Sequence, residues 1–246
     1  MRKQALCLIV AAALLAACSM GPRFDNHPQP SLTVDHAPFA EAGCPTDATG
    51  WPRCQPDSPL AALGCDAMRP APDLLGGLDP PYPIALCEIY PHWHEDDPAR
   101  SDEALQASGA YVLRRGGLWP VYVRYVIYGE GAYAIIKDAA ALRALFAPIE
   151  SPEEALSYAL AATGLDALYG LARQPNHAYE GQVIRDSHVT SATNGYRLLL
   201  YHTQVFGCGP HWTHAVELHV RSDGEISELS RKPAFRDRST DGMCID

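Results

Sequence analysis

The sequence predicts an α+β fold: a helix packed on an antiparallel sheet of four or more strands, with an N-terminal coil rich in proline and cysteine and braced by disulfides. Two observations predict it. A strongly capped helical segment in the second half of the chain is followed by short apolar segments separated by turn residues. Proline and cysteine are concentrated between residues 44 and 98.

The strongest helix signal is the stretch SPEE at 151–154. Its serine suits the N-cap, its proline suits the first helical position, and its second glutamate completes a capping box. Apolar residues follow at helical spacing, and Gly164 suits a left-handed C-cap. The sequence therefore predicts a helix over 152–163, with a second, shorter helical turn over 165–172.

Strands are predicted on both sides of this helix. The segment 119–128 is dense in β-branched and aromatic residues, 133–136 returns antiparallel to it, and Asp138 then caps a helix that ends near Phe146. After the helix, Asp223-Gly224 is a two-residue hairpin signal. Apolar and polar residues alternate before it, which predicts a strand with one buried face and one solvent-exposed face. The predicted strands of this four-stranded meander are 181–190, 195–206, 213–221 and 225–230.

This order of elements, from SPEEALSYALAATGL to VELHVRSDGEI, loosely resembles the PepSY and cystatin-like group of small envelope domains. The resemblance covers about 80 residues at the level of element order and a few apolar positions, and the long loops depart from it. It implies a binding module or an inhibitor of a protease.

The N-terminus has the features of an export signal. A basic start precedes an apolar run over 5–17 that is too short to span a bilayer. Leu15-Ala16-Ala17-Cys18 resembles the lipobox of bacterial lipoproteins, which implies cleavage before Cys18 and acylation of that cysteine; a signal cut elsewhere and an uncleaved anchor are the alternatives. In such lipoproteins an aspartate after the cysteine often marks retention in the inner membrane, so the resemblance, with Ser19 at that position, implies the outer membrane.

Charge excludes one class of partner. Cleavage removes two of the 19 basic residues, so the 17 that remain against 29 acidic residues carry a formal charge of -12. Such a chain repels nucleic acid and gains nothing from anionic headgroups, so we expect contact with a membrane only through a lipid anchor.

The sequence divides into four segments: a signal peptide at 1–17, a lipidated cysteine and flexible tether at 18–43, an irregular segment at 44–98, and the α+β domain at 99–246. The tether is predicted from its proline and polar residues, and the irregular segment from its eleven prolines. Residues 44–98 and 99–246 are expected to form one globular unit.

Six cysteines follow Cys18, and in an exported chain they predict three disulfides whose pairing the sequence leaves open. No C-x2-C pair supports a zinc or redox site. The candidate disulfide residues are Cys44, Cys54, Cys65, Cys87, Cys208 and Cys244.

Histidines offer one route to catalysis. His92 and His94 with His211 and His214 would supply ligands for a catalytic zinc if their two loops met, which predicts a zinc-dependent envelope hydrolase as an alternative function. The spacing favours surface or loop histidines over a metal site, because His211 and His214 would point to opposite sides of an extended segment. No other catalytic signature and no cofactor motif occur in the chain.

Tryptophans offer a route to binding. Trp93, Trp119 and Trp212 fall near predicted loops or strand ends, where rigid aromatic side chains bind sugars, peptides or proteins with little loss of entropy. The leading hypothesis is a lipoprotein that acts as a binding module and not as an enzyme. Its expected partner is an unknown envelope protein or glycan.

Overall fold

The computed structural model describes residues 21–46 and 50–245. The predicted signal peptide and Cys18 lie outside the described residues. No helix among the described residues is both long and apolar enough to cross a membrane.

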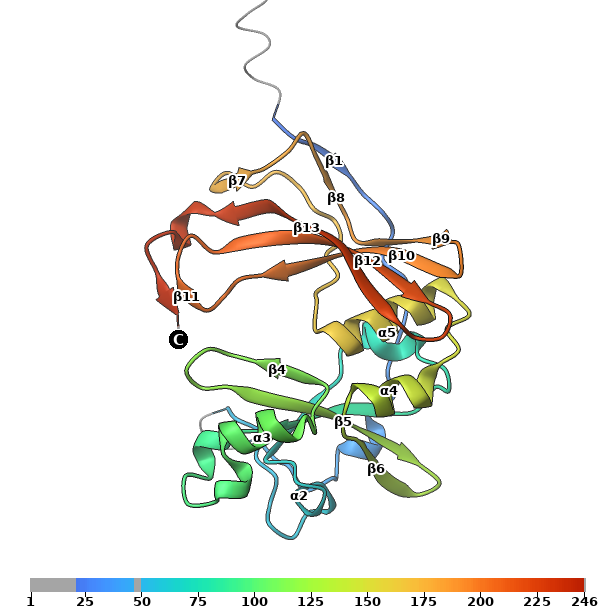
Figure 1. Ribbon diagram of the computed structural model, residues 1–246, viewed down its shortest axis with the longest axis vertical. Coiled ribbons are helices and arrows are strands. Elements are labelled where there is room, and N and C mark those ends of the chain that lie inside the picture. The colour runs from blue at the N-terminus through green and yellow to red at the C-terminus, as the bar shows by residue number, and fades with distance from the viewer. Residues whose placement is uncertain (1–20, 47–49, 246) are drawn as a thin grey trace, which may run out of the picture.

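Two five-stranded antiparallel sheets form the molecule (Figure 1). The C-terminal sheet has the order β7-β13-β12-β10-β9, and in the N-terminal sheet β3 lies between β2 and β5, while β4 and β6 both pair with β5. The α+β prediction is confirmed. The strands of the C-terminal sheet are β7 His177–Tyr179, β9 His188–Ala192, β10 Gly195–Thr203, β12 Trp212–Arg221 and β13 Ile226–Asp237. Those of the N-terminal sheet are β2 Ala67–Pro70, β3 Ile84–Ile89, β4 Leu113–Arg115, β5 Val121–Gly129 and β6 Ala132–Ile136.

Helices α4 (Ala139–Phe146) and α5 (Pro152–Thr163) lie between the two sheets (Figure 1). Helix α5 has the predicted capping box at Ser151, and Gly164 has the left-handed conformation. Its residues belong to one core with the inner faces of both sheets. The hydroxyl of Tyr125 in β5 donates to Ala161, and that of Tyr158 donates to Gly224, so α5 is hydrogen-bonded toward both sheets.

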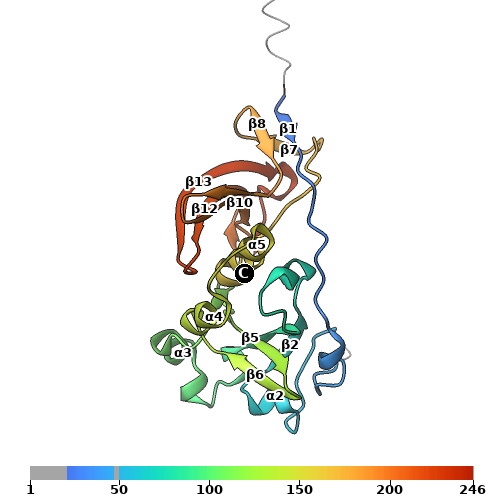
Figure 2. The same cartoon turned by 90° about the vertical axis from the view of Figure 1, so that its right-hand side faces the viewer.

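The prediction of a flexible tether is wrong for residues 21–43. Strand β1 (Arg23–Asp25) pairs in parallel with β8 (Val183–Arg185), and the chain then runs down one side of the molecule to the N-terminal sheet (Figure 2). Val34 and Phe39 are buried there. Widely spaced apolar residues hold this segment, although its mean composition is that of a disordered chain.

The prediction of an irregular segment over 44–98 is also wrong in part. It supplies helix α2 (Pro59–Ala62), β2 and all six buried residues of β3, a central strand. Prolines lie mainly outside these elements, where they do not interrupt the ladder of β3. Helix α3 (Asp102–Ser108) follows this segment.

Three further boundaries differ from the sequence prediction. Residues 165–172 form no helix, because Asp166 instead makes a bridge with Tyr201 of β10. The predicted strand 181–190 is broken into β8 and β9 at the fully buried Asp186. Strand β13 continues to Asp237, past the predicted end at 230.

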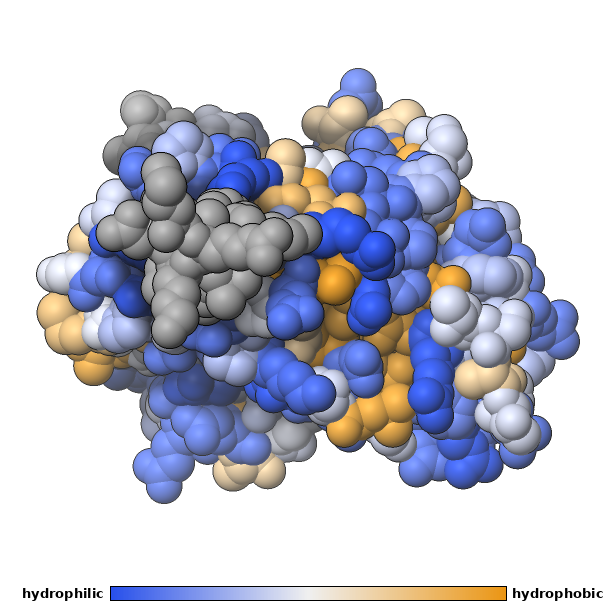
Figure 3. Space-filling model, turned by 90° about the horizontal axis from the view of Figure 1, so that it is seen from above, coloured by the Kyte–Doolittle hydropathy of each residue, from blue (hydrophilic) through white to orange (hydrophobic). Residues whose placement is uncertain are grey.

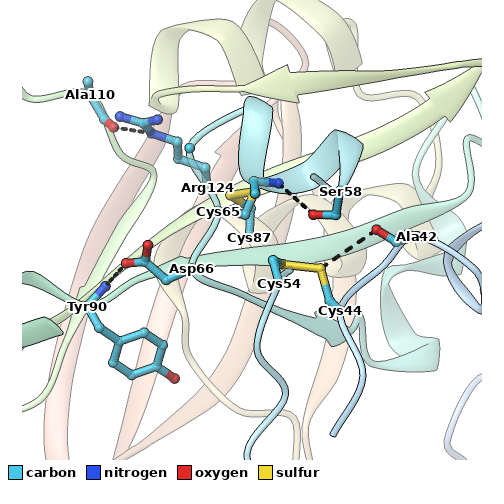
Figure 4. The surroundings of a disulfide bond; sticks show 12 residues. Ala42, Cys44, Cys54, Ser58, Cys65, Asp66, Cys87, Tyr90, Ala110 and Arg124 are labelled. Atoms are coloured by element: carbon cyan, nitrogen blue, oxygen red, sulfur yellow. Dashed lines mark hydrogen bonds between the residues drawn. A yellow bond between two sulfur atoms is a disulfide. The ribbon is translucent and has the colours of Figure 1, made fainter. Parts of the chain in front are cut away.

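The six predicted cysteines form three disulfides between successive pairs: Cys44–Cys54, Cys65–Cys87 and Cys208–Cys244. Figure 4 shows the first two side by side, with Cys65–Cys87 beside the strand that carries Arg124. The third joins the short strands β11 (Gly207–Cys208) and β14 (Cys244–Ile245) at the other end of the chain. The disulfides therefore lie near both ends of the chain, one of them fixed to the central strand β3, and not in the N-terminal coil alone.

Candidate functional site: a cleft between the two sheets

A cleft of about 570 Å³ opens where the C-terminal end of α5 meets the two sheets. One wall is β4 with the following glycine, and the other is the end of β10 with the loop that follows it. We call this space the inter-sheet cleft. Its lining residues are 113–116, Thr163, Gly164, Asp166 and 202–206.

Exposed apolar side chains lie in the two loops that continue the walls of the inter-sheet cleft. Leu118 is 71% exposed and Trp119 is 58% exposed in the loop between β4 and β5, and Val205 and Phe206 are 43% and 42% exposed in the facing loop. The two loops touch: a Cβ on Gly117 would lie 3.6 Å from the Cβ of Phe206. We call these four side chains the apolar rim.

Local sequence explains why the two loops project. Gly116 has φ 91°, and a Cβ there would lie 2.7 Å from the carbonyl oxygen of Trp119, so this tight turn requires glycine. On the opposite side, the ring nitrogens of buried His211 lie 3.1 Å from the carbonyl oxygens of Gln204 and Met243. The disulfide Cys208–Cys244 adds a covalent brace next to this loop.

The inter-sheet cleft is lined by two ionisable side chains with shifted pKa values, Asp166 and His202. Desolvation raises the pKa of Asp166, while the positive charges of Arg115 and His202 act in the opposite direction. Desolvation also lowers the pKa of His202, as do Arg231 and His214 nearby. Among the described side chains, no carboxylate lies within ion-pair distance of Arg115, which therefore keeps its charge available at the cleft.

The structure brings two of the three predicted binding tryptophans together. The ring of His92 lies 5.0 Å from that of Trp119 and 5.9 Å from that of Trp93. Trp93 is itself packed, because it stacks on Tyr90 at 4.2 Å. Trp212 belongs to the other sheet, where Arg236 lies over its ring at 5.0 Å. Trp119 is thus the predicted tryptophan that reaches the apolar rim.

The four histidines of the predicted zinc site are not brought together. Those after β3 have their own partners: His94 lies 2.7 Å from Asp66, and His92 contacts the tryptophans. His211 holds a loop of the C-terminal sheet, and His214 faces His202 across β10 and β12. Within residues 21–46 and 50–245, no three His, Cys, Asp or Glu side chains are grouped to hold a metal ion.

Sequence reasoning did not identify most of the cleft. Leu118 and the pair Val205-Phe206 carried a usable signal, since large apolar residues beside glycines in a loop have no strand or helix to bury them. Asp166 and His202 carried none, because they are 36 residues apart and meet only through the bridge between Asp166 and Tyr201.

Comparisons of the chain with protein family models, with curated proteins and with solved structures find no match in any of the three. The resemblance to PepSY and cystatin-like domains stays a prediction. The element order behind it, a helix followed by β9, β10, β12 and β13, is present.

Proposed function

We propose that the protein is a non-catalytic, lipid-anchored envelope lipoprotein that binds another envelope component, a protein or a glycan, at the inter-sheet cleft. The observation that carries this proposal is the apolar rim. Four large apolar side chains from two touching loops are between 42% and 71% exposed: Val205 and Phe206 line the cleft, and Leu118 and Trp119 lie in the loop that continues its other wall. Contiguous exposed apolar side chains beside a cleft are typical of binding sites.

The surroundings of the rim suit a binding partner with polar groups as well. Arg115 and His202 supply donors beside the apolar side chains, and Trp119 supplies a rigid surface with an indole N–H. Among the described strands β4 pairs only with β5, so its other edge is unpaired, and its residues line the cleft. An extended segment of a partner protein can add to such an edge.

The lipid anchor is the second part of the proposal. The motif at 15–18 supports it, and β1 begins only five residues after Cys18. Because β1 is paired with β8, an anchor at Cys18 would hold the domain close to the membrane and not at the end of a long tether. The acylated cysteine is tested by metabolic labelling with an alkyne fatty acid, which should label the wild-type chain and leave a Cys18→Ala variant unlabelled.

Site-specific photo-crosslinking in intact cells tests the cleft. A photoreactive amino acid at position 206 should form a crosslinked adduct in the envelope, whereas the same group at position 229 should not. Leu229 is the matched control, because it is 46% exposed on β13 but does not line the cleft. For a glycan partner, co-sedimentation with isolated cell-wall material replaces the crosslink.

A matched pair of substitutions makes the test specific. Trp119→Ala together with Phe206→Ala should abolish the adduct or the co-sedimentation, since truncating aromatic anchors removes most of the energy of an interface. Trp51→Ala, at a residue that is 46% exposed outside the cleft lining, should leave it intact. Equal adducts from positions 206 and 229 would contradict the proposal.

A further inference from the structure

A second cavity, separate from the cleft, lies on the opposite face of the C-terminal sheet, where Tyr201 packs with Ile184 and Phe235. It has a volume of about 330 Å³ and lies between β1, β7, β8 and β13 and the loop that begins at Leu168. Its walls are mainly apolar, which distinguishes it from the inter-sheet cleft. Six of its apolar lining residues are Phe24, Leu168, Leu171, Tyr179, Ile184 and Phe235.

One buried polar atom belongs to this cavity. His177 lines it, and its Nδ1 is buried and has no hydrogen-bond partner among the described residues. A buried ring nitrogen without a partner is costly unless a ligand or water supplies one. Gln174 also lines the cavity and is exposed, so the polar residues form one part of a largely apolar wall. An apolar pocket with one or two polar groups orients a ligand that has a polar end.

The size of the cavity suits a hydrocarbon chain. At about 30 Å³ for a water-sized group, 330 Å³ holds about eleven such groups, and a methylene is of similar size. Aromatic rings also contact one another along the wall. The ring centroid of Tyr179 lies 5.5 Å from that of Phe24 and 6.1 Å from that of Phe235. A chain longer than about eleven carbons would extend out of the mouth.

The position of the cavity points to a lipid. Phe24 lines it and lies in β1, three residues after Gly21, the first described residue, at the end of the molecule that also holds β7 and β8 (Figure 1). Viewed from that end, hydrophobic residues gather in the middle of the surface (Figure 3). From Cys18 to Phe24 an extended chain spans at most about 20 Å, so the cavity is within reach of lipid at the anchor.

We infer that this cavity binds a long-chain fatty acyl group, with its hydrocarbon between Phe24, Ile184 and Phe235 and its carboxyl or ester oxygen at His177. The chain belongs either to a separate lipid or to the acylated Cys18, and the two sources share this chemistry. The site is distinct from the inter-sheet cleft, so its failure leaves the proposed function unaffected.

Binding of a fluorescent long-chain fatty acid to the exported chain beginning at Ser19, which contains every described residue, tests the inference. We expect saturable binding that, once the probe is shorter than about eleven carbons, weakens by about fourfold for each further methylene removed, the factor set by the transfer free energy of one buried methylene. Binding that is not saturable, or that does not depend on chain length, would overturn the inference.

Two variants localise the binding. Ala172→Trp fills the mouth from an exposed position without disturbing the core and should abolish binding, while Ala107→Trp, at an exposed position of α3, should not. His177→Leu keeps the apolar volume and should weaken binding of the acid by about three- to tenfold through loss of one hydrogen bond. Unchanged affinity in Ala172→Trp would overturn the site.

A crosslink distinguishes the two sources of the chain. The lipidated chain in phospholipid vesicles would carry p-benzoylphenylalanine in place of Gln174, an exposed residue that lines the cavity, so that the mouth at Ala172 stays open. A crosslink to the acylated Cys18 peptide identifies the protein's own lipid, and a crosslink to vesicle phospholipid identifies a separate one. A crosslink to neither would overturn the inference.

Discussion

The carboxylate of Asp186 fastens the N-terminal strand to the domain, and its removal gives a sharp prediction. Asp186 is fully buried. Its oxygens accept hydrogen bonds from the backbone N–H groups of Gly170 at 2.8 Å and Leu171 at 2.9 Å, from the side chain of Asn26 at 3.1 Å, and from the N–H of His27 at 3.2 Å. One carboxylate thus joins the loop before β7 to the segment after β1.

The magnitude follows from the two shortest bonds. A hydrogen bond to a charged group is worth about 1.5–3 kcal/mol, so these two contribute about 3–6 kcal/mol. Water can reach the exposed Gly170 and the half-buried His27 after substitution and satisfy part of the loss. Asp186→Ala should therefore lower the free energy of unfolding by about 3 kcal/mol, and Asp186→Asn, which keeps one acceptor oxygen, by about half as much.

Urea unfolding, followed by circular dichroism, measures this loss at pH 7. Asp25→Ala in β1 is the matched control. The Asp25 carboxylate lies 3.5 Å from the guanidinium of Arg185, and both side chains are half exposed. Such a surface pair contributes less than about 1 kcal/mol. If Asp186→Ala unfolds at the same urea concentration as Asp25→Ala, the reasoning is refuted.

The same carboxylate predicts a pH dependence. Burial alone raises the pKa of Asp186, but hydrogen bonds from Leu171, Gly170, Asn26 and His27 outweigh it and hold the pKa below its ordinary value. A depressed carboxyl pKa contributes stability above the ordinary pKa of about 3.9 and loses it as the pH falls through the folded-state pKa. The difference between wild type and Asp186→Ala should therefore shrink in strong acid.

Three further predictions concern other parts of the fold. Ser151→Ala removes the N-cap of α5 and should cost about 1 kcal/mol in urea unfolding. Replacing Cys208 and Cys244 by serine opens a loop of sequence separation 36 and should cost about 4 kcal/mol in the chain-entropy account, measured as a lower thermal midpoint. His202 should titrate by NMR below the ordinary histidine pKa of about 6.5, and Arg231→Gln should raise its pKa. An unchanged pKa of His202 in Arg231→Gln would contradict the influence of the arginine charge.

Local signals predicted helices α4 and α5 and the four strands of the C-terminal meander. The capping box at 151–154 and the glycine at 164 act within a few residues, so α5 has the predicted bounds. The alternation in β12 is equally local, with Val216, Leu218 and Val220 buried and Glu217 exposed.

Elements that depend on long-range packing were not predicted from local signals. Strand β3 has six consecutive buried residues and so shows no alternation, and prolines precede it. Segment 21–43 has too few apolar residues to predict order, yet β1 finds a partner about 160 residues away. The cleft combines residues 113–116 with 202–206, and neither half has a sequence pattern of its own.

Footprinting by hydroxyl radicals, in the native envelope and on the purified chain, tests most directly whether the apolar rim is a binding surface. The proposal predicts that Leu118, Trp119 and Phe206 are oxidised readily in the purified chain but nearly as slowly as buried Phe146 in the envelope, while exposed Leu229 is oxidised equally in both. Equal oxidation of the rim in both settings would show that nothing covers it and would contradict the account.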